Sequence, residues 1–131
     1  METSGIIVDT DIIIDYLKKA QPGADILKKH YLSTRINITS ITLYELLCGV
    51  QKSGNERLIN RLLRYVTVVP LDEASARKAA ALHYALKCKG MDIGVKDSLI
   101  AGICEAHKLP LLTRNIKHFS RVPGIKLLPL K

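Results

Sequence analysis

Short apolar runs alternate along this chain with longer amphipathic stretches, and this alternation narrows the possible folds more than any other feature. The runs at residues 6–8 and 66–69 are rich in β-branched side chains, which is typical of strands buried on both faces. The stretches between the runs carry apolar residues at helical spacing. We therefore expect an α/β fold: a three-layer α/β/α sandwich with a central parallel sheet of four to five strands.

The 131 residues suit one domain, which we predict to cover 1–131. The predicted strands cover residues 6–8, 35–38, 66–69, 111–112 and 126–128. The predicted helices cover about residues 11–19, 24–31, 55–65, 72–89 and 96–108, and a further helix runs from a cap at Thr39 or Ser40 to about Val50.

The charge of the chain indicates what kind of partner it binds, and its cysteine content indicates the cellular compartment. The net charge of +8 and a pI near 9.5 favour a polyanionic partner such as nucleic acid. Three cysteines in apolar helical contexts, with no C-x-x-C pair, argue against zinc and for a reducing compartment. No apolar run approaches the roughly 18 residues of a membrane helix. We expect a cytoplasmic protein without a membrane partner.

Asp9 directly follows the first apolar run. Ligand sites in open α/β sheets lie beyond the carboxyl ends of the strands, where Asp9 would stand. Its alternative role is to cap the following helix, which aspartate often does. Asp11 is the better candidate for that cap, which would leave Asp9 free for chemistry.

Two more carboxylates lie among apolar neighbours. Glu45 stands within the apolar segment 41–48, where an unpaired carboxylate is costly to bury. No basic residue lies three or four positions away, which leaves a distant ion pair or an exposed helix edge as alternatives. Asp97 begins an apolar helix, where it could also serve the helix dipole. Three converging carboxylates would repel one another unless a hard cation such as Mg²⁺ or Mn²⁺ joined them. That cation could activate water against a phosphodiester.

Four motifs occur in an order that resembles the PIN-domain family, and in particular the VapC-type toxins of prokaryotic toxin–antitoxin pairs. The motifs are VDTDIIIDYL at 8–17, SITLYELLCG at 40–49, KDSLIA at 96–101 and LLTRNIKHF at 111–119. The resemblance implies an α/β/α fold and a hydrolase, an endoribonuclease dependent on Mg²⁺ or Mn²⁺. It also implies a homodimer and inhibition by a cognate antitoxin encoded beside it.

By position, Asp9, Glu45 and Asp97 match the acidic residues of the family, which are both metal ligands and catalytic. Thr10 and Ser98 match hydroxyl positions beside these acids, where they would orient a ligand. The remaining matches are Thr113, which precedes the fourth site of the family, and Asn115, which occupies it.

Asn115 departs from the family pattern because many members have an acid there. An amide carries no charge, so we expect one well-bound ion, and Asn115→Asp should tighten metal binding. Lys96 and Arg114 adjoin the proposed site and are the predicted RNA contacts. His118 has no metal-ligand spacing with the acids and is only a weaker candidate for RNA contact.

Two other interpretations remain open at the level of sequence. A phosphatase of the haloacid-dehalogenase type would use the D-x-D formed by Asp9 and Asp11. That family expects threonine or valine where this chain has Ile13, and Glu45 would have no role. A catalytically silent PIN-like RNA-binding module is the other alternative. The three acids argue against it, whereas Asn115 is compatible with it.

Overall fold

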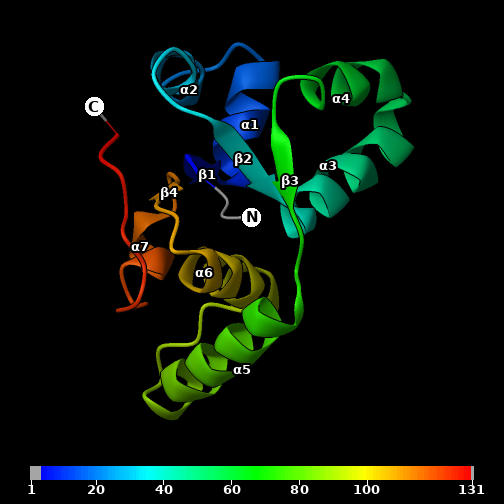
Figure 1. Cartoon of the computed structure of the whole chain (residues 1–131). Helices are drawn as coiled ribbons and strands as arrows, with labels where there is room; N and C mark the ends of the chain where they lie inside the picture. The colour runs from blue at the N-terminus through cyan, green and yellow to red at the C-terminus, as the bar shows by residue number, and fades with distance from the viewer. Residues whose placement is uncertain (1–3, 131) are drawn as a thin grey trace.

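A computed structural model describes residues 4–130 of the chain as a four-stranded parallel sheet with helices on both faces (Figure 1). The strands are β1 (Ile6–Val8), β2 (Ile36–Thr39), β3 (Thr67–Val69) and β4 (Leu111–Leu112), in the order β3-β2-β1-β4. The helices are α1 (Thr10–Leu17), α2 (Gly23–Tyr31), α3 (Ser40–Ser53), α4 (Glu56–Leu62), α5 (Glu73–Cys88), α6 (Val95–His107) and α7 (Ile116–Phe119).

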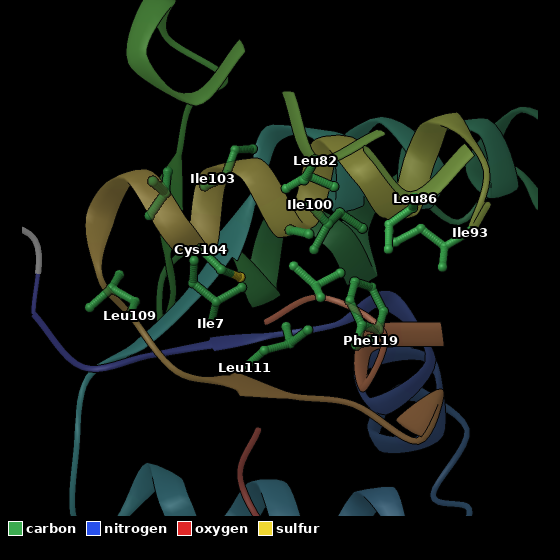
Figure 2. Close-up of a cluster of buried hydrophobic side chains, with 13 residues drawn as sticks. Ile7, Leu82, Leu86, Ile93, Ile100, Ile103, Cys104, Leu109, Leu111 and Phe119 are labelled. Carbon is green, nitrogen blue, oxygen red and sulfur yellow. The ribbon is translucent and has the colours of Figure 1, made fainter. Parts of the chain in front are cut away.

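Side chains of β1 alternate between the two faces of the sheet, and each face has its own core. Ile7 packs with α5, α6 and α7, in a core that includes Ile100 and Phe119 (Figure 2). Ile6 and Val8 point the other way, into the core that the sheet forms with α1 to α4. The predicted α/β/α sandwich is therefore confirmed.

The order of the strands reverses beside β1. From β1 the chain first builds β2 and β3 on one side, and later places β4 on the other side of β1. Ligands of open parallel sheets bind where the strand order reverses in this way. Val8 lies in register with Leu112. The residues that follow these two strands, Asp9 and Thr113, therefore meet at this edge.

Several predicted element limits differ from the structure. Residues 126–128 form no strand: Leu127 makes a single parallel bridge to Leu111, so the sheet described over 4–130 has four strands. The helix predicted to reach residue 65 ends at Leu62. Helix α3 continues to Ser53 and ends at Gly54, whose φ of 72° favours glycine. The short helix α7 was not predicted.

The cysteines are less buried than their apolar neighbours in sequence suggest. All three are free thiols, and only Cys104 is buried, whereas Cys48 and Cys88 are exposed. The expectation of apolar surroundings is thus wrong for two of them, which lie on outward faces of their helices. Every helix within 4–130 is too short or too polar to cross a bilayer. The single domain over 1–131 stays a prediction, since 1–3 and 131 lie outside the described residues.

Candidate active site

Asp9 ends β1 and is the N-cap of α1. Its Oδ1 accepts a hydrogen bond from the backbone N of Thr10 (2.8 Å), and its Oδ2 accepts one from the Thr113 hydroxyl (2.7 Å). The prediction that Asp11 caps this helix is wrong. Asp11 lies in the first turn and its Oδ2 accepts from the backbone N of Arg114 (3.1 Å). Asp9 therefore both starts the helix and presents a carboxylate at the edge of the sheet.

The Asp9 carboxyl has an unusually high pKa. Burial is the main cause and raises the pKa to about 7, since only 6% of the residue is exposed. The charges of Asp11 and, to a smaller extent, Asp97 act in the same direction, while the hydrogen bonds from Thr113 and Thr10 lower the pKa. The ionised form of Asp9 thus has too little positive charge around it.

Glu45 approaches Asp9 from α3 through Thr10. The Thr10 hydroxyl is 2.8 Å from Glu45 Oε1 and 2.9 Å from the Thr42 hydroxyl. Each hydroxyl has one proton, and an ionised carboxylate only accepts. Thr10 therefore donates to Glu45 and accepts from Thr42, which in turn accepts from Thr39 (3.4 Å). This chain of hydroxyl groups orients Glu45 from the N-cap of its own helix.

Lys96 forms the distant ion pair that the sequence left open for Glu45. Its Nζ lies 3.0 Å from Glu45 Oε2, and this hydrogen bond raises the pKa of Lys96. The Lys96 side chain remains 61% exposed. Its ammonium group is consequently both a partner of Glu45 and accessible to a ligand at the rim of the site, which is compatible with the predicted RNA contact.

Asp97 lies in the first turn of α6, whose N-cap is Gly94, so Asp97 is not the cap of this helix. Its Oδ2 accepts from Asn115 Nδ2 (3.0 Å) and lies 2.9 Å from His118 Nδ1. The role predicted for Ser98 differs from the structure. The only proton of its hydroxyl is donated to the backbone oxygen of Gly94 (2.7 Å), so Ser98 orients no acid.

Asn115 and His118 both come from the segment around α7. The backbone N of Asn115 donates to the Thr113 hydroxyl (2.9 Å), which links the Asp9 and Asp97 parts of the site. His118 is a site residue that the sequence assigned only to RNA contact. Its position three residues after Asn115 was the available signal, because residues i and i+3 share one side of a helical turn.

Arg114 has a different environment from the one predicted. Its Nε lies 3.0 Å from Asp15 Oδ2 and its Nη2 lies 3.2 Å from Asp15 Oδ1, a two-point ion pair with a buried carboxylate. Asp15 also accepts from the backbone N of Gly23 (3.1 Å). The guanidinium of Arg114 thus ties its loop to α1 and α2, and the RNA contact of this residue stays a prediction.

The donor set has the chemistry of a site for a hard cation, although the side chains do not enclose one. Within residues 4–130, no three His, Cys, Asp or Glu side chains are grouped closely enough to form a ready ligand shell. Each acid is held instead by protein donors. The acids Asp9, Glu45 and Asp97 nevertheless offer only oxygen, as Mg²⁺ and Mn²⁺ prefer. A buried oxygen of Asp11 has no hydrogen-bond partner, and the raised pKa of Asp9 reflects uncompensated charge.

Comparisons with known sequences agree with this geometry. The model of the PIN domain matches residues 6–125. The chain is similar to the tRNA(fMet)-specific endonuclease VapC of Salmonella typhimurium, with 31% identity over 99 residues that cover 72% of this chain and 75% of that protein. It is also 30% identical to Ribonuclease VapC1 of Methanocaldococcus jannaschii over 131 residues, which cover 96% of this chain and 88% of that protein.

Solved structures show the same fold. DNA-bound VapBC from Salmonella typhimurium aligns with a TM-score of 0.88 and 27% identity, covering 98% of this chain and 100% of that chain. VapBC2 from Rickettsia felis, bound to a DNA fragment from its promoter, aligns with a TM-score of 0.85 and 28% identity, covering 95% and 98%.

Proposed function

The chain belongs to the PIN-domain family, and we propose that it is an endoribonuclease, a hydrolase acting as the toxin of a toxin–antitoxin pair. Relatives that align over most of its length are named ribonuclease or endonuclease VapC. Structures that share its fold are VapBC complexes. The haloacid-dehalogenase alternative is not supported. The family match favours the PIN assignment, and so do the contacts of Glu45 in the site, since Glu45 would have no role in a phosphatase of that type.

One observation carries this proposal: three acids far apart in sequence belong to one hydrogen-bond network at the carboxyl edge of the sheet. Asp9, Glu45 and Asp97 are joined there through Thr10, Thr113 and Asn115. We propose that the three carboxylates together hold one Mg²⁺ or Mn²⁺. Such an ion lowers the pKa of a bound water and offsets the negative charge that develops on a phosphodiester.

The other polar residues would position these acids and the substrate. Thr113 and Thr10 donate to Asp9 and Glu45, and so keep one oxygen of each in a defined direction. Lys96 offers an exposed ammonium beside Glu45, where an RNA phosphate could replace part of its contact. Asn115 donates an N–H to Asp97 and adds no negative charge, which favours one ion over two.

A cleavage assay tests this proposal. The purified protein should cut RNA in Mg²⁺ or Mn²⁺ and not in EDTA. Asp97→Asn should lower the rate at least about 100-fold, as expected for loss of a metal ligand. Asp25→Asn is the matched control, because Asp25 is an exposed aspartate on α2, a helix that carries none of the proposed site residues. Wild-type protein that binds RNA without cutting it in either metal would instead support the silent binding module.

We also propose where the antitoxin binds. An apolar groove of about 740 Å³ lies between α1, α2 and α4, and its walls include Leu27, Tyr31 and Leu32. Lys19, Lys28 and Arg61 lie along the same groove and make it basic. This combination suits an amphipathic segment with acidic flanks.

Co-purification with the antitoxin encoded by the adjacent reading frame tests the groove. Leu32 is 87% exposed, so Leu32→Glu should disrupt binding without unfolding the protein. Tyr84→Glu is the control, because Tyr84 is exposed on α5 outside this groove. Equal retention of the antitoxin by both variants would place it on another surface.

We further propose a homodimer in the cytoplasm. The supporting observation is a group of exposed apolar side chains on α3 and at the start of α6, comprising Tyr44, Leu47 and Val95. Burial of such a group between two copies would remove apolar area from water. Sedimentation should give twice the mass of the chain, and Tyr44→Glu should reduce it to that of one copy.

A further inference from the structure

His118 contacts the carboxylate of Asp97 directly, although the family pattern assigns it no role here. Its Nδ1 lies 2.9 Å from Asp97 Oδ2, the oxygen that also accepts from Asn115 Nδ2 at 3.0 Å. An ionised carboxylate can only accept hydrogen bonds. The proton of a neutral His118 ring must therefore reside on Nδ1, and Asp97 Oδ2 receives two N–H donors.

We infer that His118 and Asn115 form a two-donor clamp on Asp97 and that His118 is a positioning residue for the metal-binding carboxylate. Two donors on Oδ2 restrict rotation of the carboxylate and would leave Oδ1 to bind a cation. An acid in place of Asn115 would repel Asp97. In this chain the fourth family position therefore acts through a hydrogen bond to another acid. The inference rests on the proposed metal-dependent function, since it concerns the same site.

The segment that carries the clamp is held firmly. Phe119, adjacent to His118, is fully buried and packs in the core beside α6, as Figure 2 shows. Asn115 is fixed at the other end of α7 by the hydrogen bond from its backbone N to Thr113. Asp97 and its two donors thus lie on elements, α6 and α7, that share one hydrophobic core. Such support from rigid elements is what a positioning contact requires.

Calorimetry with Mn²⁺ in the absence of RNA tests the clamp. His118→Leu removes the N–H donor and should weaken Mn²⁺ binding about 10-fold or more, as for other partners of metal ligands. His118→Asn keeps an N–H near the position of Nδ1 and should stay within about 3-fold of wild type. His83→Leu, which removes a histidine paired with Asp92 on the surface, should leave affinity unchanged. Equal or tighter binding by His118→Leu would overturn the inference, because His118 would then compete with the ion.

Nitrogen NMR separates failure of the clamp from failure of the proposed function. In the metal-free protein, Nδ1 of the His118 ring should carry a proton. Asp97→Asn should change the tautomer distribution, and neither spectrum requires metal. A wild-type ring protonated only on Nε2 would refute the clamp whatever the metal affinity. A correct tautomer without any Mn²⁺ binding would refute the metal function and leave the contact itself intact.

Discussion

Replacing Asp9 by Asn should stabilise the metal-free protein at high pH and destabilise it slightly at low pH. Burial raises the pKa of Asp9 from 3.8 to about 7 in the folded state. Between these values the folded state binds more protons than the unfolded state, so stability falls as the pH rises. The cost is absent below pH 3.8 and complete above pH 7. The amide of the Asp9→Asn variant cannot ionise, so the variant does not have this free-energy cost.

The size of the effect follows from the pKa. One pH unit corresponds to about 1.4 kcal/mol, so ionisation of Asp9 costs the folded state about 4 kcal/mol above pH 7. The amide of the variant keeps only one of the two oxygens that accept from Thr10 and Thr113, and the lost acceptor costs about 1 kcal/mol at every pH. We therefore expect Asp9→Asn to be about 3 kcal/mol more stable than wild type at pH 8 and about 1 kcal/mol less stable at pH 4.

Urea unfolding in EDTA from pH 4 to pH 8 measures this difference. Asp72→Asn is the control with the opposite sign, because hydrogen bonds from Ser75 lower the pKa of Asp72. Because the pKa of Asp72 in the folded state lies below 3.8, that variant should be less stable than wild type by a difference that does not change between pH 4 and pH 8. Addition of Mn²⁺ at pH 8 should stabilise wild type more than Asp9→Asn, since the variant lacks one of the three proposed carboxylate ligands. A difference between Asp9→Asn and wild type that stays constant with pH would refute the reasoning.

Two further predictions concern packing and ion pairing. Arg114→Ala leaves the buried Asp15 carboxylate without its partner and should lower the free energy of unfolding by about 2 kcal/mol or more, measured in urea. Gly102→Ala should cost about 1–3 kcal/mol, because the added Cβ would lie 2.5 Å from the Cβ of Ala79 where α5 crosses α6. Gly49→Ala, within α3 and with nothing within 4 Å, should instead raise the melting temperature.

Sequence patterns predicted the sheet because each strand is a short apolar run that can be recognised from its own residues. They were less informative at the ends of elements. Residues 126–128 look like a strand, but Leu127 reaches Leu111 at one bridge only. Helix α7 is four residues long, and the burial of Phe119 is a tertiary effect with no local periodicity. Short segments whose structure depends on distant contacts are therefore the ones that the sequence does not determine by itself.

The acids of the candidate site could be proposed from sequence, whereas the pairing of Glu45 with Lys96 and of Asp97 with His118 could not. Glu45 and Lys96 are 51 residues apart, and Asp97 and His118 are 21 apart. Neither separation matches the repeat of a helix or a strand, so residue spacing could not indicate these pairs. The same limit explains Arg114, whose partner Asp15 lies 99 residues earlier. Adjacency to a site residue suggested an RNA contact for Arg114, but it gave no indication of the ion pair with the buried carboxylate on α1.

During translation Asp9 is synthesised early, whereas Thr113, whose hydroxyl donates to the Asp9 carboxylate, follows 104 residues later. A nascent polypeptide that has not passed residue 112 lacks β4, so the carboxyl edge beside β1 is still open. Until residue 118 is added, Asp97 also lacks the imidazole that contacts it. The three acids can all be present on the ribosome well before the site is assembled. A cell that synthesises this protein is thus not exposed to the complete site until residue 118 has been made.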